Sequence, residues 1–323
     1  MSNQYFLWFD MRMAESVTLS GQVATQWVIN DLNDYLNRVI GGERRDYVVA
    51  ADTDSVYVRF DELVTKVGIG DRTESEIADF LNEACDKKIK GVIDASCLSW
   101  DAYLNAFPGK LKMKREKIAE SAIWTAKKKY AMLVWYGEEG KYKAPEMDFT
   151  GLEVVTGKTP KICRDRMKTT IKKMLTEDEA GVQAYIKQFR EEFETLRVED
   201  IGSITSVSGI RDKTDAKGYP MLGATQQTRA AISYNRMIAE LDLENKYQAI
   251  KEDEKIRVVL LNEPNPAHSP VIGCTNVMPP EFGIESYVDR DAQFEKVYLK
   301  PMKQLLDVIG WQATKKPSLA SFF

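Results

Sequence analysis

The first part of the chain alternates between apolar stripes at helical spacing and short β-type runs. Stripes recur every three to four positions over residues 15–40 and 77–89, and the first ends at Gly41-Gly42. Because side chains three or four positions apart share one face of a helix, this spacing predicts two amphipathic helices. The stripe residues are Ala24, Val28, Leu32, Tyr35, Leu36 and Val39 in the first, and Ile77, Phe80, Leu81, Ala84, Cys85 and Ile89 in the second.

Two segments have the pattern of β-hairpins. Residues 47–58 carry apolar β-type residues on both sides of a short polar centre. Residues 130–136 are rich in β-branched and aromatic side chains and lead into a glycine-bearing turn at residues 137–140. With the two helices covering one face of the sheet, the pattern predicts an α+β fold.

Helical stripes dominate after about Thr150, so we expect a domain boundary there, with domains over residues 1–150 and 151–316. Thr159 and Pro160 are expected to cap and begin the first helix of the second domain. Residues 203–227, crowded with Gly, Ser, Thr and Asp, predict a loop-rich insert in this mostly helical part. The helical stripes are Cys163, Met167, Ile171 and Met174, then Val182, Tyr185, Ile186, Phe189 and Phe193, then Phe294, Val297, Tyr298, Leu305 and Leu306.

The composition is that of a soluble globular protein, with 44% hydrophobic residues among 323, enough for the cores of two domains. Neither an apolar run of about 18 residues nor a basic-then-apolar leader is present, so no membrane span and no secretory signal are expected. Four widely spaced cysteines without a Cys-x-x-Cys pair argue against zinc and disulfides and favour a cytoplasmic location. A single histidine, His268, gives no support to histidine catalysis or to a histidine metal site.

Positive charge is concentrated in one segment of a chain whose net charge is −4. Residues 110–173 contain 17 Lys and Arg against 8 Asp and Glu, a local charge of +9, so the remainder carries −13. This asymmetry is typical of a protein that holds a polyanion in a basic groove on an acidic body. Solvated basic helix faces would give the same count, so charge alone does not decide.

The polar centre of the first hairpin, Asp52-Thr53-Asp54-Ser55, is the main candidate for chemistry. Side chains alternate along an extended strand, so Asp52 and Asp54 are expected on the same side. Two carboxylates on a rigid strand end suit a hard divalent cation such as Mg²⁺. Two other interpretations fit these residues: an ordinary solvated turn, and the Asp-x-Asp site with which many sugar transferases hold a metal and a nucleotide diphosphate.

Two further motifs lie in the basic segment. Lys127, Lys128, Lys129 and Tyr130 stand at the start of a predicted strand, where alternate side chains face one surface and could reach a phosphate backbone. Lysine clusters are also common on solvated turns. Glu116, inside the cationic run of residues 114–117, is a candidate third carboxylate.

In their order and spacing, Asp52-Thr53-Asp54-Ser55, Lys127-Lys128-Lys129-Tyr130 and Gly151-Leu152-Glu153 resemble motifs of the C-terminal palm and thumb of family B replicative DNA polymerases, in particular those of T-even-type bacteriophages. Phe9-Asp10-Met11-Arg12 and Gly21-Gln22 resemble the palm helix, and Arg229 with Tyr234-Asn235-Arg236 resembles the thumb near primer-template DNA. The resemblance covers nearly the whole chain. It implies a palm over residues 1–150 and a thumb over residues 151–316.

The resemblance implies template-directed nucleotidyl transfer from deoxynucleoside triphosphates by a two-metal mechanism with Mg²⁺. Asp54 would bridge both ions, Asp52 would be a secondary ligand, and Glu116 an auxiliary carboxylate. The residues implied to bind primer-template DNA are Lys127, Lys128, Lys129, Tyr130, Lys161, Arg229, Tyr234 and Asn235.

The C-terminal residues 317–323, with Leu319, Phe322 and Phe323, are similar to the peptide by which such polymerases dock on a sliding clamp. A segment that folds back on its own domain is the alternative. The family's first aspartate motif, fingers and exonuclease precede the region that this chain resembles.

We therefore expect the C-terminal subunit of a split polymerase, which acts with an N-terminal partner chain in the cytoplasm of a phage-infected bacterium. A cloned fragment of such a polymerase, and a non-catalytic DNA- or clamp-binding accessory protein, stay open as alternatives.

Overall fold

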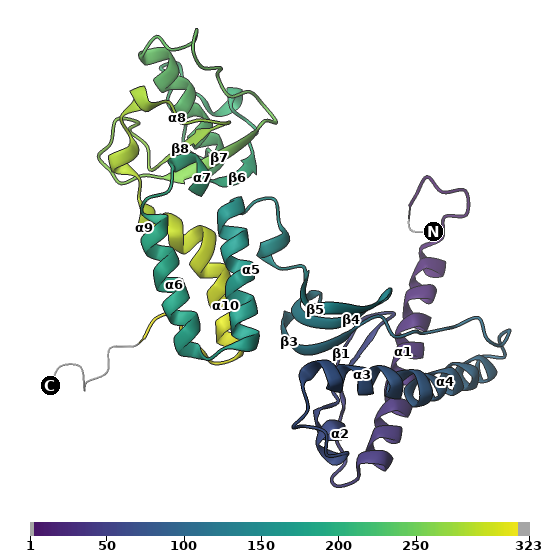
Figure 1. Ribbon diagram of the computed structural model, residues 1–323. Helices are drawn as coiled ribbons and strands as arrows, with labels where there is room; N and C mark the ends of the chain where they lie inside the picture. The colour runs from purple at the N-terminus through teal and green to yellow at the C-terminus, as the bar shows by residue number, and fades with distance from the viewer. Residues whose placement is uncertain (1–2, 316–323) are drawn as a thin grey trace. The chain divides into compact units, whose positions relative to one another are not determined.

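The computed structural model describes residues 3–315, and the chain divides into two compact units (Figure 1). The first comprises Met1–Ala122 and Met132–Asp148, and the second Ile123–Ala131 and Phe149–Phe323. The chain passes from the first unit to the second between Asp148 and Phe149, next to the expected boundary at Thr150. The assignment of Ile123–Ala131 to the second unit was not expected. Both units combine helices with small antiparallel sheets, which is compatible with the predicted α+β fold. Among the residues described, no helix has the length and apolar character needed to cross a bilayer.

The first unit is built on the 30-residue helix α1 (Met11–Ile40). It begins after Asp10, whose carboxylate accepts a hydrogen bond from the Arg12 backbone N–H, and ends before Gly41. The predicted helix is thus confirmed, with a start four residues earlier than expected. The other elements are β1 (Val48–Ala51), β2 (Val56–Val58), α2 (Asp61–Lys66), α3 (Glu74–Ala84), the π-helical segment η1 (Cys85–Ile89) and α4 (Lys90–Tyr103).

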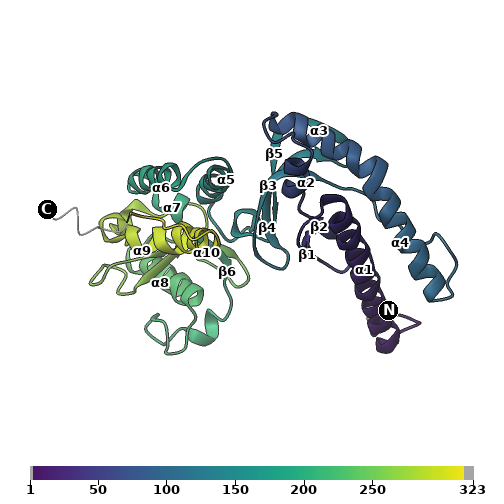
Figure 2. The ribbon, with the colours of Figure 1, turned by 90° about the horizontal axis from the view of Figure 1, so that it is seen from below.

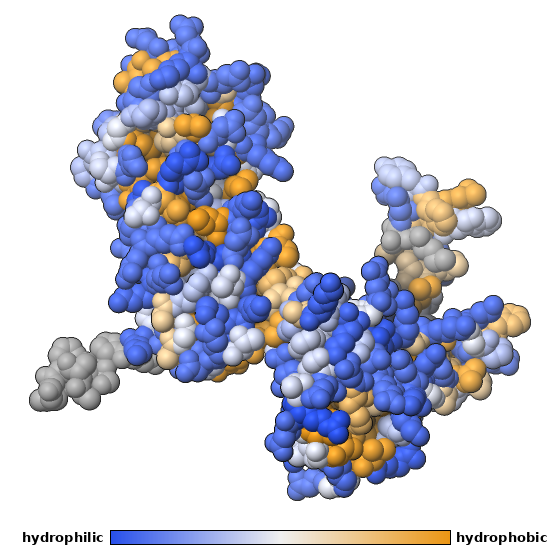
Figure 3. Space-filling view, in the orientation of Figure 1, coloured by the Kyte–Doolittle hydropathy of each residue, from blue (hydrophilic) through white to orange (hydrophobic). Residues whose placement is uncertain are grey.

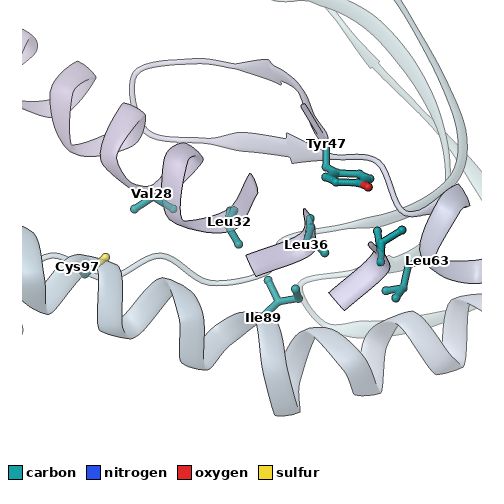
Figure 4. Packing of buried hydrophobic residues seen from close by; sticks show 8 residues of the cluster. Val28, Leu32, Leu36, Tyr47, Leu63, Ile89 and Cys97 are labelled. Carbon is teal, nitrogen blue, oxygen red and sulfur yellow. The ribbon is translucent and has the colours of Figure 1, made fainter. Parts of the chain in front are cut away.

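The core of this unit forms where α1 packs against the hairpin and against α4, which runs beside α1 (Figures 1, 2 and 4). The predicted stripe of α1 faces this core, because Val28, Leu32 and Leu36 are almost completely buried. The side chain of Asn33, also on α1, accepts a hydrogen bond from the Tyr47 backbone N–H at 2.8 Å. Helix α1 therefore fixes the entry of the chain into the hairpin.

A three-stranded sheet in the order β3-β4-β5 follows, made of β3 (Ile118–Ala126), β4 (Lys129–Gly137) and β5 (Gly140–Thr150). The turn between β4 and β5 lies where the second hairpin was predicted. Lys127 and Lys128 form the turn between β3 and β4, inside the short segment that belongs to the second unit.

Helices α5 and α6 of the second unit lie side by side (Figures 1 and 2). Their predicted stripes are buried, and the rings of Phe189, Phe193, Phe294 and Tyr298 pack together, with centroids of Phe189 and Tyr298 4.7 Å apart. The helical elements of this part are the 3-10 helix η2 (Glu153–Val155), α5 (Lys161–Thr176), α6 (Glu179–Phe193), α7 (Val198–Ile201), α9 (Arg290–Phe294), the π-helical segment η6 (Glu295–Leu299) and α10 (Lys300–Val308).

The second unit also contains a small sheet, which the expectation of a mostly helical domain did not include. Strand β7 pairs antiparallel with β6 and β8, and α8 packs on β8. The missed signal is the β-branched content of β7, where Ile256, Val258 and Val259 are all buried. The elements are β6 (Ser203–Ser206), η3 (Arg211–Lys213), α8 (Gln226–Glu240), β7 (Lys255–Leu260), β8 (Val271–Cys274), η4 (Pro280–Phe282) and η5 (Glu285–Tyr287).

All four cysteines lie within the described residues and are free thiols. Cys97, Cys163 and Cys274 are buried, and Cys85 is half-buried.

Candidate active site and basic surface

The turn between β1 and β2 carries the two candidate metal ligands. The Asp52 backbone N–H donates to the Ser55 carbonyl at 2.9 Å, so Thr53 and Asp54 form the bend between them. Asp54 is exposed and Asp52 is half-buried, with one carboxylate oxygen accepting from the Thr53 backbone N–H at 2.9 Å. The strand alternation that was expected to place both carboxylates on one side does not extend to Asp54, because β1 ends at Ala51 and the chain reverses at the bend.

Helix α1 holds this turn in place. The hydroxyl of Thr25 donates to the Thr53 carbonyl oxygen at 2.7 Å, and Thr25 itself is buried. One turn earlier on the helix, a Cβ added to Gly21 would lie 3.4 Å from the Thr53 side chain, an ordinary van der Waals distance, so this position of α1 also lies against the hairpin turn. The two α1 residues that face the turn thus fix the position of the bend that carries Asp54.

Two carboxylates on an accessible turn fit a Mg²⁺ site by the chemistry of their donors, because Mg²⁺ takes one or two protein carboxylates and keeps water and phosphate oxygens as its other ligands. Within residues 3–315, no three histidine, cysteine or carboxylate side chains gather as a group that could hold a metal. Glu116 is exposed in the segment before β3, and it does not form such a group with the two aspartates in this part of the chain. The cations beside it have other partners, since Lys114 pairs with Glu138 and Lys117 with Asp148.

The structure brings two of the sequence motifs into direct contact within the second unit. Lys128 sits in the β3–β4 turn with a left-handed backbone (φ of 61°). A Cβ added to Gly151, itself at a φ of 63°, would lie 2.0 Å from the Lys128 carbonyl oxygen. Glycine is therefore required at position 151, both for its left-handed conformation and for this close approach.

Around this contact, exposed lysine side chains form a basic surface, and aromatic rings lie beside them. Lys127, Lys128 and Lys129 are exposed, and the ring of Tyr130 lies 5.9 Å from that of Trp124. A cavity of about 30 Å³ next to the contact is lined by residues of β3 and β4 beside the turn, of the Gly151 segment and of helices α5 and α10. The residues lining it are Thr125, Lys129, Gly151, Leu152, Glu153, Val154, Met167, Pro301, Met302, Gln304 and Leu305.

Lys161 is the first residue of α5 and is exposed. The helix begins one residue later than predicted: Pro160 occupies the N-cap position, and Thr159 is buried before it. Outside the apolar stripe, Arg164, Lys168 and Lys172 follow Lys161 at helical spacing. Sequence reasoning missed these three cations, although their spacing of three or four residues was the available signal.

Helix α8 places the remaining predicted DNA-binding residues differently from what was expected. Tyr234 is only 2% exposed and packs edge-on against Phe282, and burial raises its pKa to about 12. The side chain of Asn235 donates to the Ile250 carbonyl oxygen and accepts from the Ile250 N–H. Both residues therefore have inward contacts, whereas Arg229 is half-exposed.

The neighbouring Arg236 is buried and joins three segments of the second unit. Its guanidinium pairs with Glu240 at 2.7 Å, donates to the Ala267 carbonyl oxygen at 2.7 Å and lies 4.4 Å from the centroid of the Tyr219 ring. Arg236, which the sequence analysis named beside Asn235, therefore stabilises the second unit through these contacts. Leu319, Phe322 and Phe323, the predicted clamp-binding residues, lie outside the residues that the structure describes.

No protein-family model matches the chain. Among proteins of known function, it is 30% identical over 336 residues to the DNA-directed DNA polymerase of Enterobacteria phage T4 and 31% identical over 339 residues to that of Escherichia phage RB69. Both alignments include 100% of this chain and 37% of the relative, so the chain spans little more than a third of the length of these polymerases. The resemblance to polymerases of T-even-type phages, predicted from the motifs, is confirmed over the whole chain.

Proposed function

We propose that this chain is the C-terminal subunit of a DNA-directed DNA polymerase, which extends a primer on template DNA from deoxynucleoside triphosphates. The observation that carries the proposal is the exposed Asp52-Thr53-Asp54-Ser55 turn, held by α1, in a chain that is similar throughout to two phage polymerases. In this proposal the first unit acts as the palm and the second as the thumb of a family B enzyme.

The carboxylates of Asp54 and Asp52 are proposed to hold the two Mg²⁺ ions of the reaction, with Glu116 as an auxiliary carboxylate. Bound Mg²⁺ supplies charge neutralisation at the triphosphate and favours ionisation of the primer 3′-hydroxyl. Asp54 is accessible to a nucleotide because it lies exposed in the bend. The hydrogen bond from the Thr53 N–H orients the Asp52 carboxylate within the turn.

The proposed DNA-binding surface combines the basic turn, the basic face of α5 and Arg229. Lysine and arginine neutralise backbone phosphates and release their counterions, which gives affinity without sequence preference. Lys127, Lys128, Lys129 and Tyr130 would follow the primer end, and Lys161, Arg164 and Lys168 would hold the duplex. Tyr234 and Asn235 would contribute indirectly, by fixing α8 through their inward contacts.

Replacing Lys161 by alanine is expected to weaken binding of a primer-template duplex severalfold at low salt. Because one phosphate contact is lost, the slope of log affinity against log salt concentration should fall by about one. Fluorescence anisotropy titrations over a range of salt concentrations measure both quantities. The matched control is Lys187→Ala on α6, whose side chain is 80% exposed beside Glu191 and should leave affinity and slope unchanged. If both variants lose the same affinity for the duplex, the loss reflects the net charge of the protein and not a phosphate contact of Lys161.

The proposal includes a second polypeptide, an N-terminal polymerase subunit, because the chain corresponds to only 37% of the length of each phage polymerase that it matches. The test is primer extension with Mg²⁺ and deoxynucleotides. The purified chain alone should be inactive, and adding the polypeptide from the same source that matches the remainder of the phage T4 polymerase should restore synthesis. Extension by the chain alone would refute the need for a partner. Binding to DNA without synthesis in the mixture would favour a non-catalytic accessory role.

Residues 317–323 are proposed to dock on a sliding clamp in the cytoplasm of a phage-infected bacterium. Deleting residues 319–323 is expected to leave distributive synthesis unchanged and to remove the increase in product length that a clamp gives. The measurement is the product length from single binding events, with and without clamp, for the full chain and for the deletion variant. If the clamp lengthens the products of both equally, the docking role is refuted.

A further inference from the structure

The hairpin that carries Asp52 and Asp54 depends on support from outside its own two strands. Within the described residues, β1 and β2 form a sheet of two strands, and the register of their pairing shifts between Val48 and Ala50. A two-stranded hairpin is marginally stable in water by itself, and an irregularity in the ladder weakens the pairing further. Contacts from neighbouring elements therefore decide where the turn at the tip of the hairpin lies.

Helix α1 contacts the hairpin at two points along its length. Near the base, the Asn33 side chain accepts hydrogen bonds from the backbone N–H groups of Tyr47, at 2.8 Å, and Val48, at 3.3 Å. At the tip, the Thr25 hydroxyl donates to the Thr53 carbonyl oxygen at 2.7 Å. Because one helical turn takes about 3.6 residues, positions 25 and 33 lie on the same side of α1, about two turns apart. The hairpin is thus held along α1 at both ends, and Thr25 provides the contact next to the carboxylates.

The hydroxyl of Thr25 makes a different contact from that of Thr18, the other threonine of α1. A threonine inside a helix commonly donates to the carbonyl oxygen one turn earlier, and Thr18 does so, to Ala14 at 3.1 Å. Thr18 is exposed, as are most side chains from residue 11 to residue 20, and Figure 3 shows hydrophobic residues, in orange, at this end of the molecule. Thr25 is only 6% exposed, and its hydroxyl bonds to the hairpin. Because a buried hydroxyl costs free energy unless it has a partner, the contact with Thr53 explains a threonine rather than a valine at this position.

The Thr53 carbonyl oxygen belongs to the peptide group that joins Thr53 to Asp54. A peptide group is planar, so a hydrogen bond that fixes this oxygen also constrains the Asp54 nitrogen and Cα. On the other side of the residue, the Thr53 backbone N–H donates to the Asp52 carboxylate at 2.9 Å. The place from which the Asp54 side chain leaves the backbone is therefore set in part by the hydroxyl of Thr25.

We propose that Thr25 is a positioning residue for nucleotidyl transfer: its hydroxyl holds the Thr53–Asp54 peptide group, and so the Asp54 carboxylate, in the place that the reaction requires. The inference rests on the proposed function and adds to it a residue of α1 outside the motifs that resemble the polymerase family. A displacement of about 1 Å at a reacting group lowers a rate by as much as about a hundredfold, so a small shift of the turn is enough to be measured.

The test uses variants of this chain in the two-chain enzyme, mixed with the same-source polypeptide that matches the remainder of the phage T4 polymerase. Thr25→Val replaces the hydroxyl by a methyl group and leaves the shape and the helix propensity almost unchanged. At saturating duplex and deoxynucleotide, its single-turnover rate is expected to fall about tenfold or more, and the Mg²⁺ concentration for half-maximal rate to rise. Its affinity for the primer-template duplex should stay within about twofold of wild type, because the proposed DNA-binding residues are unchanged.

Two further variants separate the hydroxyl from the rest of the side chain and from the helix. Thr25→Ser keeps the hydroxyl and should restore most of the rate. Thr18→Val makes the same exchange in the exposed part of α1 and should keep the wild-type rate and Mg²⁺ dependence. Hydrogen exchange of the chain alone supplies a readout that needs neither metal nor partner: peptides spanning residues 47–58 should exchange faster in Thr25→Val, and at the wild-type rate in the other two variants.

A Thr25→Val enzyme with the wild-type rate and Mg²⁺ dependence would overturn the inference. Equal losses in Thr25→Val and Thr25→Ser would overturn it as well, because they would assign the effect to packing of the methyl group. If circular dichroism shows that Thr25→Val is unfolded, Thr25→Ala removes the same hydroxyl and takes its place in each comparison. A wild-type mixture that makes no DNA would overturn the proposed function itself, and the positioning role with it, even where hydrogen exchange confirms the contact between Thr25 and the turn.

Discussion

Asp54→Ala in the two-chain enzyme is expected to lower nucleotide incorporation by about a thousandfold or more, with duplex binding almost unchanged. The carboxylate of Asp54 is exposed in the bend, so its removal leaves no buried partner unsatisfied and should not alter folding. The proposed loss therefore lies in charge stabilisation during phosphoryl transfer and not in affinity for DNA. Single-turnover primer extension measures the first quantity, and anisotropy titration with the same duplex measures the second.

The matched control for this experiment is Asp71→Ala, which removes an exposed aspartate from the loop between α2 and α3 in the same unit. Its incorporation rate should equal that of the wild type. If Asp54→Ala keeps its rate, Asp54 has no role as a metal ligand. If it loses DNA binding as well, the turn has a structural role that the proposed mechanism does not include.

Gly151→Ala is expected to destabilise the second unit by about 2–4 kcal/mol, the sum of a left-handed conformation and overpacking. The new methyl group would lie 2.0 Å from the Lys128 carbonyl oxygen, and this atom belongs to the backbone, so no side-chain rotation relieves the clash. Either the basic turn moves or the segment after β5 does. Hydrogen exchange of peptides spanning residues 124–131 and 149–155 should accelerate, and affinity for duplex DNA should fall.

Gly157→Ala provides the control, because an added Cβ at Gly157 meets nothing within 4 Å and the residue has no left-handed backbone. This substitution should leave exchange unchanged, or slow it slightly by restricting the unfolded chain. If hydrogen exchange in Gly151→Ala equals that of the wild type, the backbone around Gly151 and Lys128 accommodates the added methyl group at little cost. The basic turn would then not depend on Gly151.

The helices of this chain could be predicted because each buries one apolar stripe. The stripes of α1, α5 and α6 recur every three to four residues, and the structure buries most of their residues; Tyr35 and Tyr185 are half-buried, and Val39 is exposed. The sheet of β6, β7 and β8 was missed because its strands are short. In addition, β6 pairs with β7, a strand far along the chain, and local pattern does not identify such a partner. The π-helical segments η1 and η6 lie within the apolar stripes of residues 77–89 and 294–306. They were therefore predicted as ordinary helix.

The candidate site was predicted in part. The Asp52-Thr53-Asp54-Ser55 hairpin formed where the apolar β-type runs on both sides of this polar centre placed it. The direction of Asp54 depends on a two-residue reversal, which strand periodicity does not describe. Tyr234 and Asn235 turned inward because α8 buries residues on several of its faces, a consequence of tertiary packing on β8. The contact between Gly151 and Lys128 joins positions that only the folded chain brings together.

The four cysteines have a consequence for chemical labelling. Burial raises the pKa of Cys85 to about 11 and of Cys163 and Cys274 to about 12, and it raises that of Cys97 as well. The thiolate is the reactive form, so at neutral pH fewer than about one in a thousand of the thiols with pKa values of 11 to 12 is ready to react. A cysteine introduced on the surface would therefore take up a maleimide dye far faster than these native thiols. The four native cysteines could therefore be kept in labelling experiments. Assembly of the two proposed subunits could then be followed through the distance between one dye on each.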